Sequence, residues 1–321
     1  MERLSYFDLH ADTLTALLDS DGSLEKNTLH TSISGGRCFD SYAQVWAVFT
    51  KPGVGYSASW EHLRAALSHS SHYLTPQGGH TPYLSVENAS MVGRDSMKGD
   101  AEYLRGCGVC LIAPVWGGEN ALGGAHNTSA GLTALGRDFV REAMRLGMVI
   151  DISHSSHAGA SDILSAAAEA GMPAVASHSC AAALCSASRN LRDDEFTAIK
   201  RSGGIVGVSL YPPHLSGGGG ASAETVADHI MHFLGLGGEA TVCLGCDFDG
   251  IETTPDGIGG IRDLPVLADT LVGRGIPAAS VEGIFFRNAE RFFERWGLKP
   301  LSESNLRYAA TTLPPSLGSL I

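Results

Sequence analysis

Eight short hydrophobic runs, each followed by a polar or glycine-rich turn and then by a helix-like pattern, constrain the fold of this chain more than any other feature. Strands that alternate with helices predict a parallel sheet, and eight such units predict an α/β fold, the (β/α)8 or TIM barrel. A doubly wound open sheet is the alternative, but it rarely needs eight units. The runs are Leu4–His10, Ala43–Phe49, Tyr83–Glu87, Val109–Trp116, Val149–His154, Ala174–His178, Ile205–Tyr211 and Val242–Asp247. The clearest helix-like stretches are Leu132–Leu146, Ser161–Ala170, Ala223–Leu236 and Ser280–Trp296.

The length of the chain is compatible with one such barrel. A (β/α)8 barrel fills about 250 residues and often more, so we expect the 321 residues to form a single domain, residues 1–321. No internal repeat and no domain boundary is visible in the sequence. We expect the chain from about residue 300, with its Pro-, Ser- and Leu-rich end from Thr311, to lie along the surface as a tail.

The composition argues against several classes of function. The formal net charge is −12, whereas nonspecific binding to nucleic acid or to anionic membranes needs an excess of Lys and Arg. No stretch approaches the roughly 20 consecutive apolar residues of a membrane span. The first residues show no secretory pattern, and an odd number of cysteines, seven, favours reduced thiols. We therefore expect a cytoplasmic protein with no nucleic-acid or membrane partner.

Chemically reactive side chains fall at one end of the expected strands. In a (β/α)8 barrel the active site lies at the carboxyl ends of the strands. A chance scatter of polar residues would not favour that end of five separate strands. The residues are Asp8, His10 and Asp12 at the first run, Glu87 at the third, His154 at the fifth, His178 at the sixth and Asp247 at the eighth.

Five of these residues suggest a metal site. His10 and Asp12 are two residues apart, so their side chains point to the same side of a strand and can bind one ion. Alone, such a pair is more often a hydrogen-bonded strand end, and a single buried histidine is more often a core residue than a ligand. However, His154 and His178 each end a separate hydrophobic run, and Glu87 would be a costly buried carboxylate unless it lay between cations. Three histidines and two carboxylates fit a pair of zinc ions about 3.5–4 Å apart.

With their flanking residues, these positions resemble the membrane (renal-type) dipeptidases, peptidase family M19, a branch of the amidohydrolase superfamily. The similarity covers most of positions 4–297, in order and with family-like spacing. No single motif is specific, but the combination is. The segments that carry the resemblance are Gly118–Asn120, Gly131–Arg137, Asp151–His154, Ala176–Ser179, Ser188–Leu191, Gly203–Gly207 and Asp247–Gly250.

The resemblance implies a metallo-dipeptidase that hydrolyses the peptide bond of small dipeptides and acts as a homodimer. Whether the C-terminal residue of the substrate can be a D-amino acid stays open. The resemblance further implies two zinc ions per subunit, or other divalent ions in their place. His10 and Asp12 would hold one ion, His154 and His178 would hold the other, and Glu87 would be shared by both.

The resemblance also implies roles in catalysis and substrate binding. Asp247 would lie beside a bridging hydroxide and transfer its proton, and Arg189 would bind the C-terminal carboxylate of a dipeptide with help from Tyr211. One position departs from the family, because many members have a histidine at the end of the fourth strand that polarises the scissile carbonyl. This chain has Trp116 near that place, which we expect to line the substrate site. Tryptophan can donate one N–H but cannot accept a hydrogen bond, and His126 on the following loop is a candidate substitute.

The same residues leave two other functions open. Another amidohydrolase reaction, on an N-acyl amino acid, a lactam or another amide, would use the same metal pair and differ only in the pocket. A barrel that has lost catalysis and serves as a binding or structural protein is disfavoured, because we would expect it to have lost a ligand or Asp247. Three other histidines lie on expected helices and should be at the surface, namely His157, His229 and His232.

Overall fold

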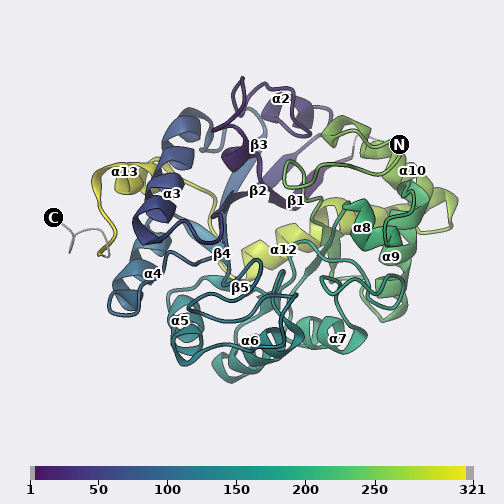
Figure 1. Cartoon of the computed structure of the whole chain (residues 1–321). Coiled ribbons are helices and arrows are strands. Elements are labelled where there is room, and N and C mark those ends of the chain that lie inside the picture. Colours follow the sequence, from purple (N-terminus) through teal and green to yellow (C-terminus); the bar gives the residue numbers. More distant parts are fainter. Residues whose placement is uncertain (1–3, 316–321) are drawn as a thin grey trace.

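The computed structural model describes residues 4–315 and shows eight parallel strands arranged around a common axis (Figure 1). The strand order is β6-β5-β4-β3-β2-β1-β8-β7, and a parallel bridge between Ala176 and Val206 joins the two ends of this series. The sheet is therefore a nearly closed barrel, which confirms the (β/α)8 fold over the open sheet. The strands are β1 (Tyr6–Ala11), β2 (Tyr42–Phe49), β3 (His80–Glu87), β4 (Val109–Ala113), β5 (Val149–Asp151), β6 (Ala174–Val175), β7 (Val206–Val208) and β8 (Val242–Leu244).

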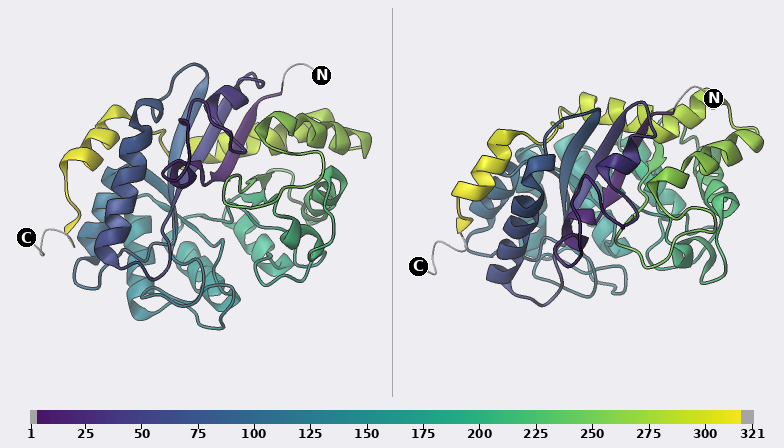
Figure 2. Two further views of the ribbon diagram at one scale, coloured as in Figure 1. Left: turned by 45° about the horizontal axis from the view of Figure 1, so that its top comes forward. Right: turned by 90° about the horizontal axis from the view of Figure 1, so that it is seen from above.

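Helices surround the strands on the outer side of the barrel (Figures 1 and 2). Among the described residues, no helix is both long enough and hydrophobic enough to cross a membrane. The α-helices are α1 (Thr13–Ala16), α2 (Ile33–Gly36), α3 (Tyr56–Ser70), α4 (Met97–Gly106), α5 (Ala134–Arg145), α6 (His157–Ala170), α7 (Asp193–Arg201), α8 (Pro212–Ser216), α9 (Ala223–Gly235), α10 (Pro265–Gly273), α11 (Ala278–Glu282), α12 (Asn288–Arg295) and α13 (Glu303–Thr311). Two short 3-10 helices are η1 (Ser71–Tyr73) and η2 (Ile261–Asp263), and η3 (Gly283–Arg287) is a π-helix.

Helix α6 shows how local side chains set the helix boundaries. The hydroxyl of Ser156 accepts a hydrogen bond from the backbone N–H of Gly159, which caps the first turn. At the other end, Gly171 adopts the left-handed conformation that commonly ends a helix. The cap explains why α6 begins at His157 and not at Ser161, where the hydrophobic periodicity alone placed its start.

Hydrophobic side chains fill the barrel at the amino ends of its strands. Phe7 and Leu9 of β1, Tyr83 of β3 and Phe293 of α12 belong to one buried cluster. The ring of Phe293 lies 4.8 Å from that of Phe7 and 4.5 Å from that of Tyr83. Figure 2 shows the yellow-green segment that contains α12 across this end of the strands. Hydrophobic packing therefore fills the barrel interior at this end.

An irregularity in β1 turns His10 toward the inside of the barrel. Asp8 pairs with Gln44, but the next pair is Ala11 with Trp46, so β1 advances by three residues where β2 advances by two. An extra residue of this kind is a β-bulge, which interrupts the alternation of side chains between the two faces. Leu9, the residue before His10, lies in the interior cluster. Strict alternation would therefore have placed the side chain of His10 on the outer face of the barrel.

Two glycines allow the segment after β6 to approach β7 and β8 closely. A Cβ atom on Gly245 would lie 1.7 Å from the carbonyl oxygen of Ser177, and one on Gly207 would lie 2.0 Å from the same atom. Both distances are far shorter than van der Waals contact, so only glycine fits. This close approach brings the residues that follow β6 to the barrel axis.

We predict that Gly245→Ala destabilises the fold. The added methyl group forces the backbone at Ser177 to shift, and overpacking of this kind costs about 1–3 kcal/mol. Urea denaturation would measure the loss in the free energy of unfolding. Gly273→Ala, at a position where a Cβ meets no atom within 4 Å, is the control and should leave stability unchanged or slightly increased. Equal stability of the two variants would contradict the close approach.

The chain beyond residue 300, which we expected to form a tail, contains a packed helix within its described part. Helix α13 contacts α3 and α4. Leu301 and Ala309 are buried, and the backbone N–H of Leu301 donates to the carbonyl of Pro82 at 2.8 Å. The part of the expected tail after residue 315 lies outside the described residues.

The expectation that His229 is a surface residue is wrong. His229 is only 1% exposed. Its Nδ1 accepts the backbone N–H of Ala181 at 2.9 Å, so its Nε2 donates to the carbonyl of Leu215 at 3.0 Å. The helix periodicity did not reveal that two loops need this imidazole to satisfy their backbone groups.

Candidate metal centre

Six ionisable side chains from five separate segments meet at the carboxyl ends of the strands. They are the residues that the sequence analysis selected as metal ligands and as the proton-transfer group. All come from strand ends or from the residues directly after them, so the barrel alone places them around one mouth. They are His10 on β1, Asp12 after it, Glu87 at the end of β3, and His154, His178 and Asp247 after β5, β6 and β8.

Glu87, His154 and His178 form a first group. The Oε1 atom of Glu87 lies 2.5 Å from Nε2 of His154 and 3.5 Å from Nε2 of His178, and these two nitrogens are 3.0 Å apart. Burial, together with the positive charge of Arg189, lowers the pKa of His154 to about 4. Burial and the nearby His10 hold the pKa of His178 well below its usual value. Two uncharged imidazoles thus converge on one carboxylate oxygen, as ligands around a cation do.

His10, Asp12 and Asp247 form a second group beside the first. Nε2 of His10 lies 3.3 Å from Oδ2 of Asp12, 3.9 Å from Oδ1 of Asp247 and 3.7 Å from Oε2 of Glu87. Burial and the negative charge of Glu87 raise the pKa of Asp12 to about 6, and burial raises the pKa of Asp247 well above its usual value. Burial lowers the pKa of His10, but Asp12 and Glu87 outweigh it and hold that pKa well above the usual value. The carboxylates of Asp12, Asp247 and Glu87 therefore favour a positive charge between them.

Backbone strain is concentrated at the same mouth. Among the described residues, four that are not glycine have a positive φ, and all lie just beyond β3, β5 or β8. This left-handed region is uncommon for side chains other than glycine, and it persists where the surrounding structure fixes it, often at functional sites. The four are Asn88 (67°), His154 (70°), Asp247 (63°) and Asp249 (68°).

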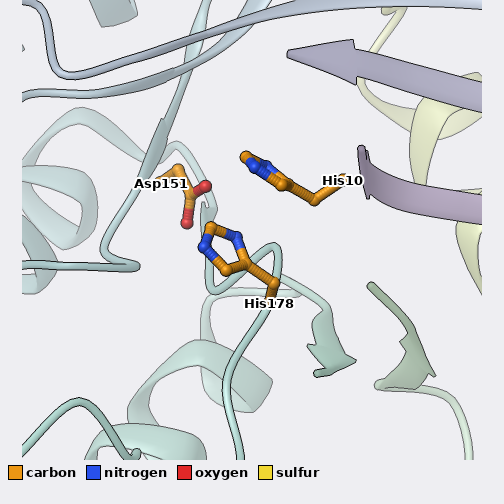
Figure 3. Close-up of side chains that lie close together, drawn as sticks. All are labelled: His10, Asp151 and His178. Atoms are coloured by element: carbon orange, nitrogen blue, oxygen red, sulfur yellow. The ribbon is translucent and has the colours of Figure 1, made fainter. Parts of the chain in front are cut away.

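Asp151 lies beside His178 (Figure 3) and orients it through Ser177. Oδ1 of Asp151 accepts the backbone N–H groups of Ser153 (2.9 Å) and Ser177 (3.0 Å), and Oδ2 accepts the hydroxyl of Ser177. Since that hydroxyl proton is used, the oxygen of Ser177 accepts the N–H at Nδ1 of His178, 2.7 Å away. This leaves Nε2 of His178 with a free lone pair. Both oxygens of Asp151 accept hydrogen bonds, so Asp151 positions His178; it also forms a candidate metal group with His10 and His178, whose ligand atoms lie within 4.8 Å of one another.

Sequence reasoning did not select Asp151 or Ser177 for the site. Each stands in the same hydrophobic run as a selected histidine, Asp151 before His154 and Ser177 directly before His178. This proximity was the available signal, but the pattern does not show that the two residues meet across neighbouring strands.

We predict that Ser177→Ala weakens zinc binding. Without the hydroxyl, the tautomer and orientation of His178 are no longer fixed, and the loss of such a supporting contact typically costs about 10- to 100-fold in metal affinity. Competition with a chromophoric chelator would measure the zinc Kd. Ser165→Ala, on the outer side of α6, is the control and should bind zinc as the unaltered protein does. An unchanged Kd in a folded Ser177→Ala variant would contradict the role.

Arg189 is a buried cation without a carboxylate partner. Arg189 is only 6% exposed. Among residues 4–315, no carboxylate oxygen lies within 4.0 Å of its guanidinium nitrogens. One terminal nitrogen donates to Oγ of Ser179 and the other to the carbonyl of His178, both at 3.2 Å, whereas its Nε has no partner. A buried unpaired charge is costly. The arrangement therefore favours an anionic ligand beside His178.

One cavity of about 550 Å³ connects Arg189 with both groups of candidate ligands. The ring of Trp116 packs against those of His154, at 5.7 Å, and Phe49, at 5.0 Å, so it forms one wall. Tyr211 also lines the cavity. A larger groove of about 910 Å³ runs between α6 and α7 on the outside of the barrel, but none of these residues lines it. The cavity at the carboxyl ends is therefore the candidate active site.

Comparison with known proteins shows the family of this chain. Residues 74–298 match the membrane dipeptidase family (peptidase family M19). The chain belongs to this family. It is 36% identical, over 208 residues, to an uncharacterised protein from Klebsiella pneumoniae, an alignment that covers 61% of this chain and 75% of that protein. The chain spans less than half the length of the fungal and mammalian dipeptidases that it also matches.

Solved structures of metallopeptidases share the barrel. A dipeptidase described as a metallopeptidase of family M19 is 26% identical, with a TM-score of 0.75 over 92% of this chain and 100% of its own. A metallopeptidase from Rhodobacter sphaeroides, bound to a phosphinate mimic of the dipeptide L-Ala-D-Ala, is 23% identical, with a TM-score of 0.81 over 92% of this chain and 99% of its own. The fold is thus that of the M19 metallopeptidases along nearly the whole chain.

Proposed function

We propose that this protein is a zinc-dependent dipeptidase that hydrolyses its substrate in the cavity at the carboxyl ends of the strands. One observation carries the proposal. The buried carboxylate of Glu87 faces two groups of candidate metal ligands, and the unpaired Arg189 lies in the same cavity. The candidate metal ligands around Glu87 suit hydrolysis, and the unpaired Arg189 suits a substrate with a free carboxylate. Family membership and the dipeptide mimic bound by the Rhodobacter sphaeroides relative support the substrate class, and we include dipeptides with a C-terminal D-residue.

The donor set fits two divalent ions per subunit. Imidazole nitrogens and carboxylate oxygens are the donors that zinc takes, although other divalent ions also fit them. Oδ1 of Asp12 is buried without a hydrogen-bond partner, and the nitrogens of His154 and His178 face each other at 3.0 Å. His10 and Asp12 would hold one ion, His154 and His178 the other, and Glu87 both. Such a pair of ions, when bound, acidifies a water molecule and polarises a carbonyl group.

Asp247 is the residue that we propose to move the proton. It follows β8, 3.9 Å from His10, and lines the cavity. Burial raises its pKa, and a carboxylate with a raised pKa is a more effective base near neutral pH. One carboxylate oxygen of Asp247 would accept the proton of the attacking water and return it to the departing amide nitrogen.

We predict that Asp247→Asn keeps its metal but loses most of its turnover. The amide is nearly isosteric but cannot accept the proton, and loss of a general base lowers kcat by roughly 10²- to 10⁴-fold. Elemental analysis of the purified variant would show whether both ions are retained, and steady-state kinetics would give kcat. A variant with unchanged turnover would remove Asp247 from the mechanism.

Arg189 is the residue that we propose to bind the C-terminal carboxylate. A guanidinium can hold a carboxylate through two parallel hydrogen bonds, and its unpartnered Nε is available for one of them. We propose that Tyr211 assists from the neighbouring wall and that Trp116 contacts the substrate where it covers His154.

We predict that Arg189→Met raises KM for dipeptides by roughly 30-fold or more, since truncating one partner of a buried charge pair costs 2–5 kcal/mol. The C-terminal amides of the same dipeptides lack the negative charge, so their KM should change far less. Steady-state kinetics on matched pairs of substrates would make the comparison. Equal effects on the acids and the amides would contradict the assigned role.

The function itself is tested by metal analysis followed by a substrate panel. We expect about two zinc ions per chain, hydrolysis of L-L or L-D dipeptides, and loss of activity with a chelator that is restored by zinc. Cleavage of N-acyl amino acids or lactams alone would favour the alternative amidohydrolase reaction. We also propose a homodimer in the cytoplasm, which light scattering and cell fractionation would test.

A further inference from the structure

His126 enters the cavity from the loop after β4. Its backbone N–H donates to the carbonyl of His154 at 2.7 Å, and the two rings lie 6.2 Å apart, so the loop is fastened beside a candidate metal ligand. The half-buried side chain lines the same cavity as Arg189. Its Nδ1 lies 3.0 Å from Oγ of Ser188, the residue directly before Arg189.

The contact with Ser188 decides which ring nitrogen faces the cavity. Nδ1 is occupied by the hydroxyl, which leaves Nε2 as the nitrogen available to a ligand. When the Ser188 hydroxyl donates to Nδ1, the N–H of the imidazole is at Nε2. His126 then offers a hydrogen-bond donor to the cavity beside Arg189.

We propose that His126 is a second binding residue for the C-terminal carboxylate of the substrate, to which its Nε2–H donates beside Arg189. The inference rests on the proposed dipeptidase function. Trp116 and His214 also bring ring nitrogens to this cavity. The ring of Trp116 stacks on that of His154 and contacts that of Phe49, and the ring of His214 packs edge-on against that of Tyr211. His126, in contrast, is anchored next to Arg189 at both its backbone and its ring.

Kinetics with matched substrates test the inference. In His126→Phe, KM for dipeptides should rise about tenfold or more, because a hydrogen bond to a charged group is lost, with kcat within about twofold of the unaltered enzyme. The dipeptide amides should be unaffected. His126→Gln can place an N–H near the position of Nε2 and should recover part of the loss. His69→Asn, an exposed position on α3, is the control and should match the unaltered enzyme.

Binding without turnover gives an independent measurement. Calorimetry on the zinc-loaded protein would compare a phosphinate dipeptide mimic with its C-terminal amide. His126→Phe should weaken binding of the acid about tenfold and leave the amide unchanged. In the Arg189→Met background the effect of His126→Phe should shrink, because residues that share a partner are not additive. Equal weakening of acid and amide, or a fall in kcat for both substrates, would instead place His126 at the scissile carbonyl and overturn the inference.

The outcomes separate this inference from the proposed function. If the unaltered enzyme cleaves dipeptides while His126→Phe matches it on every ligand, only the role of His126 is wrong. If the unaltered, zinc-loaded enzyme neither cleaves dipeptides nor binds the mimic, the proposed function fails.

Discussion

The buried carboxylate of Glu87 is the constraint on which the rest of the site depends. It is 3% exposed at the end of a strand, where loss of hydration strongly disfavours an isolated negative charge. Its two oxygens face different partners, Oε1 toward His154 and His178 and Oε2 toward His10. Burial raises the pKa of Glu87, but its interactions and hydrogen bonds with the imidazoles of His154 and His10 outweigh it and hold that pKa below the usual range. A site built in this way requires cationic charge on both sides of one side chain.

The surrounding backbone is shaped to satisfy that requirement. The bulge in β1 brings His10 inward, and the left-handed conformation of His154 turns the chain immediately after β5. Gly207 and Gly245 admit the backbone that carries His178. Each of these features costs conformational freedom or regular hydrogen bonding, and all of them occur at one end of the barrel. The opposite end, filled by Phe7 and Phe293, carries the packing that holds the strands in register.

Much of the fold and of the candidate site could be predicted because the signals are local. A strand buried on both faces is a continuous hydrophobic run, and each of the eight runs overlaps an observed strand. The histidines that ended two of these runs do converge with Glu87. The strands β4 to β8 end before their runs do; β5, for example, ends at Asp151, and the chain then turns before His154. That turn is a backbone conformation, which hydrophobicity does not encode.

What could not be predicted depends on contacts between distant segments. The bulge in β1 is defined only by its pairing with β2. The tautomer of His178 follows from Asp151, which belongs to another strand. His229 was misplaced because its two partners lie in loops 48 and 14 residues away. In each case the residue type was visible in the sequence, but its hydrogen-bond partner was not.

The proximity of Arg189 to the candidate metal ligands limits which bond of a substrate could react. Its guanidinium donates to the carbonyl of His178 at 3.2 Å, so a carboxylate bound there would lie directly beside the first group of ligands. In a peptide, only a nitrogen and one Cα separate the C-terminal carboxyl carbon from the carbonyl of the last peptide bond. Holding the carboxylate at Arg189 therefore presents the last peptide bond to that group and keeps more distant bonds away. In the proposed function, the choice of the last peptide bond thus follows from where a buried positive charge is placed and not from recognition of particular side chains.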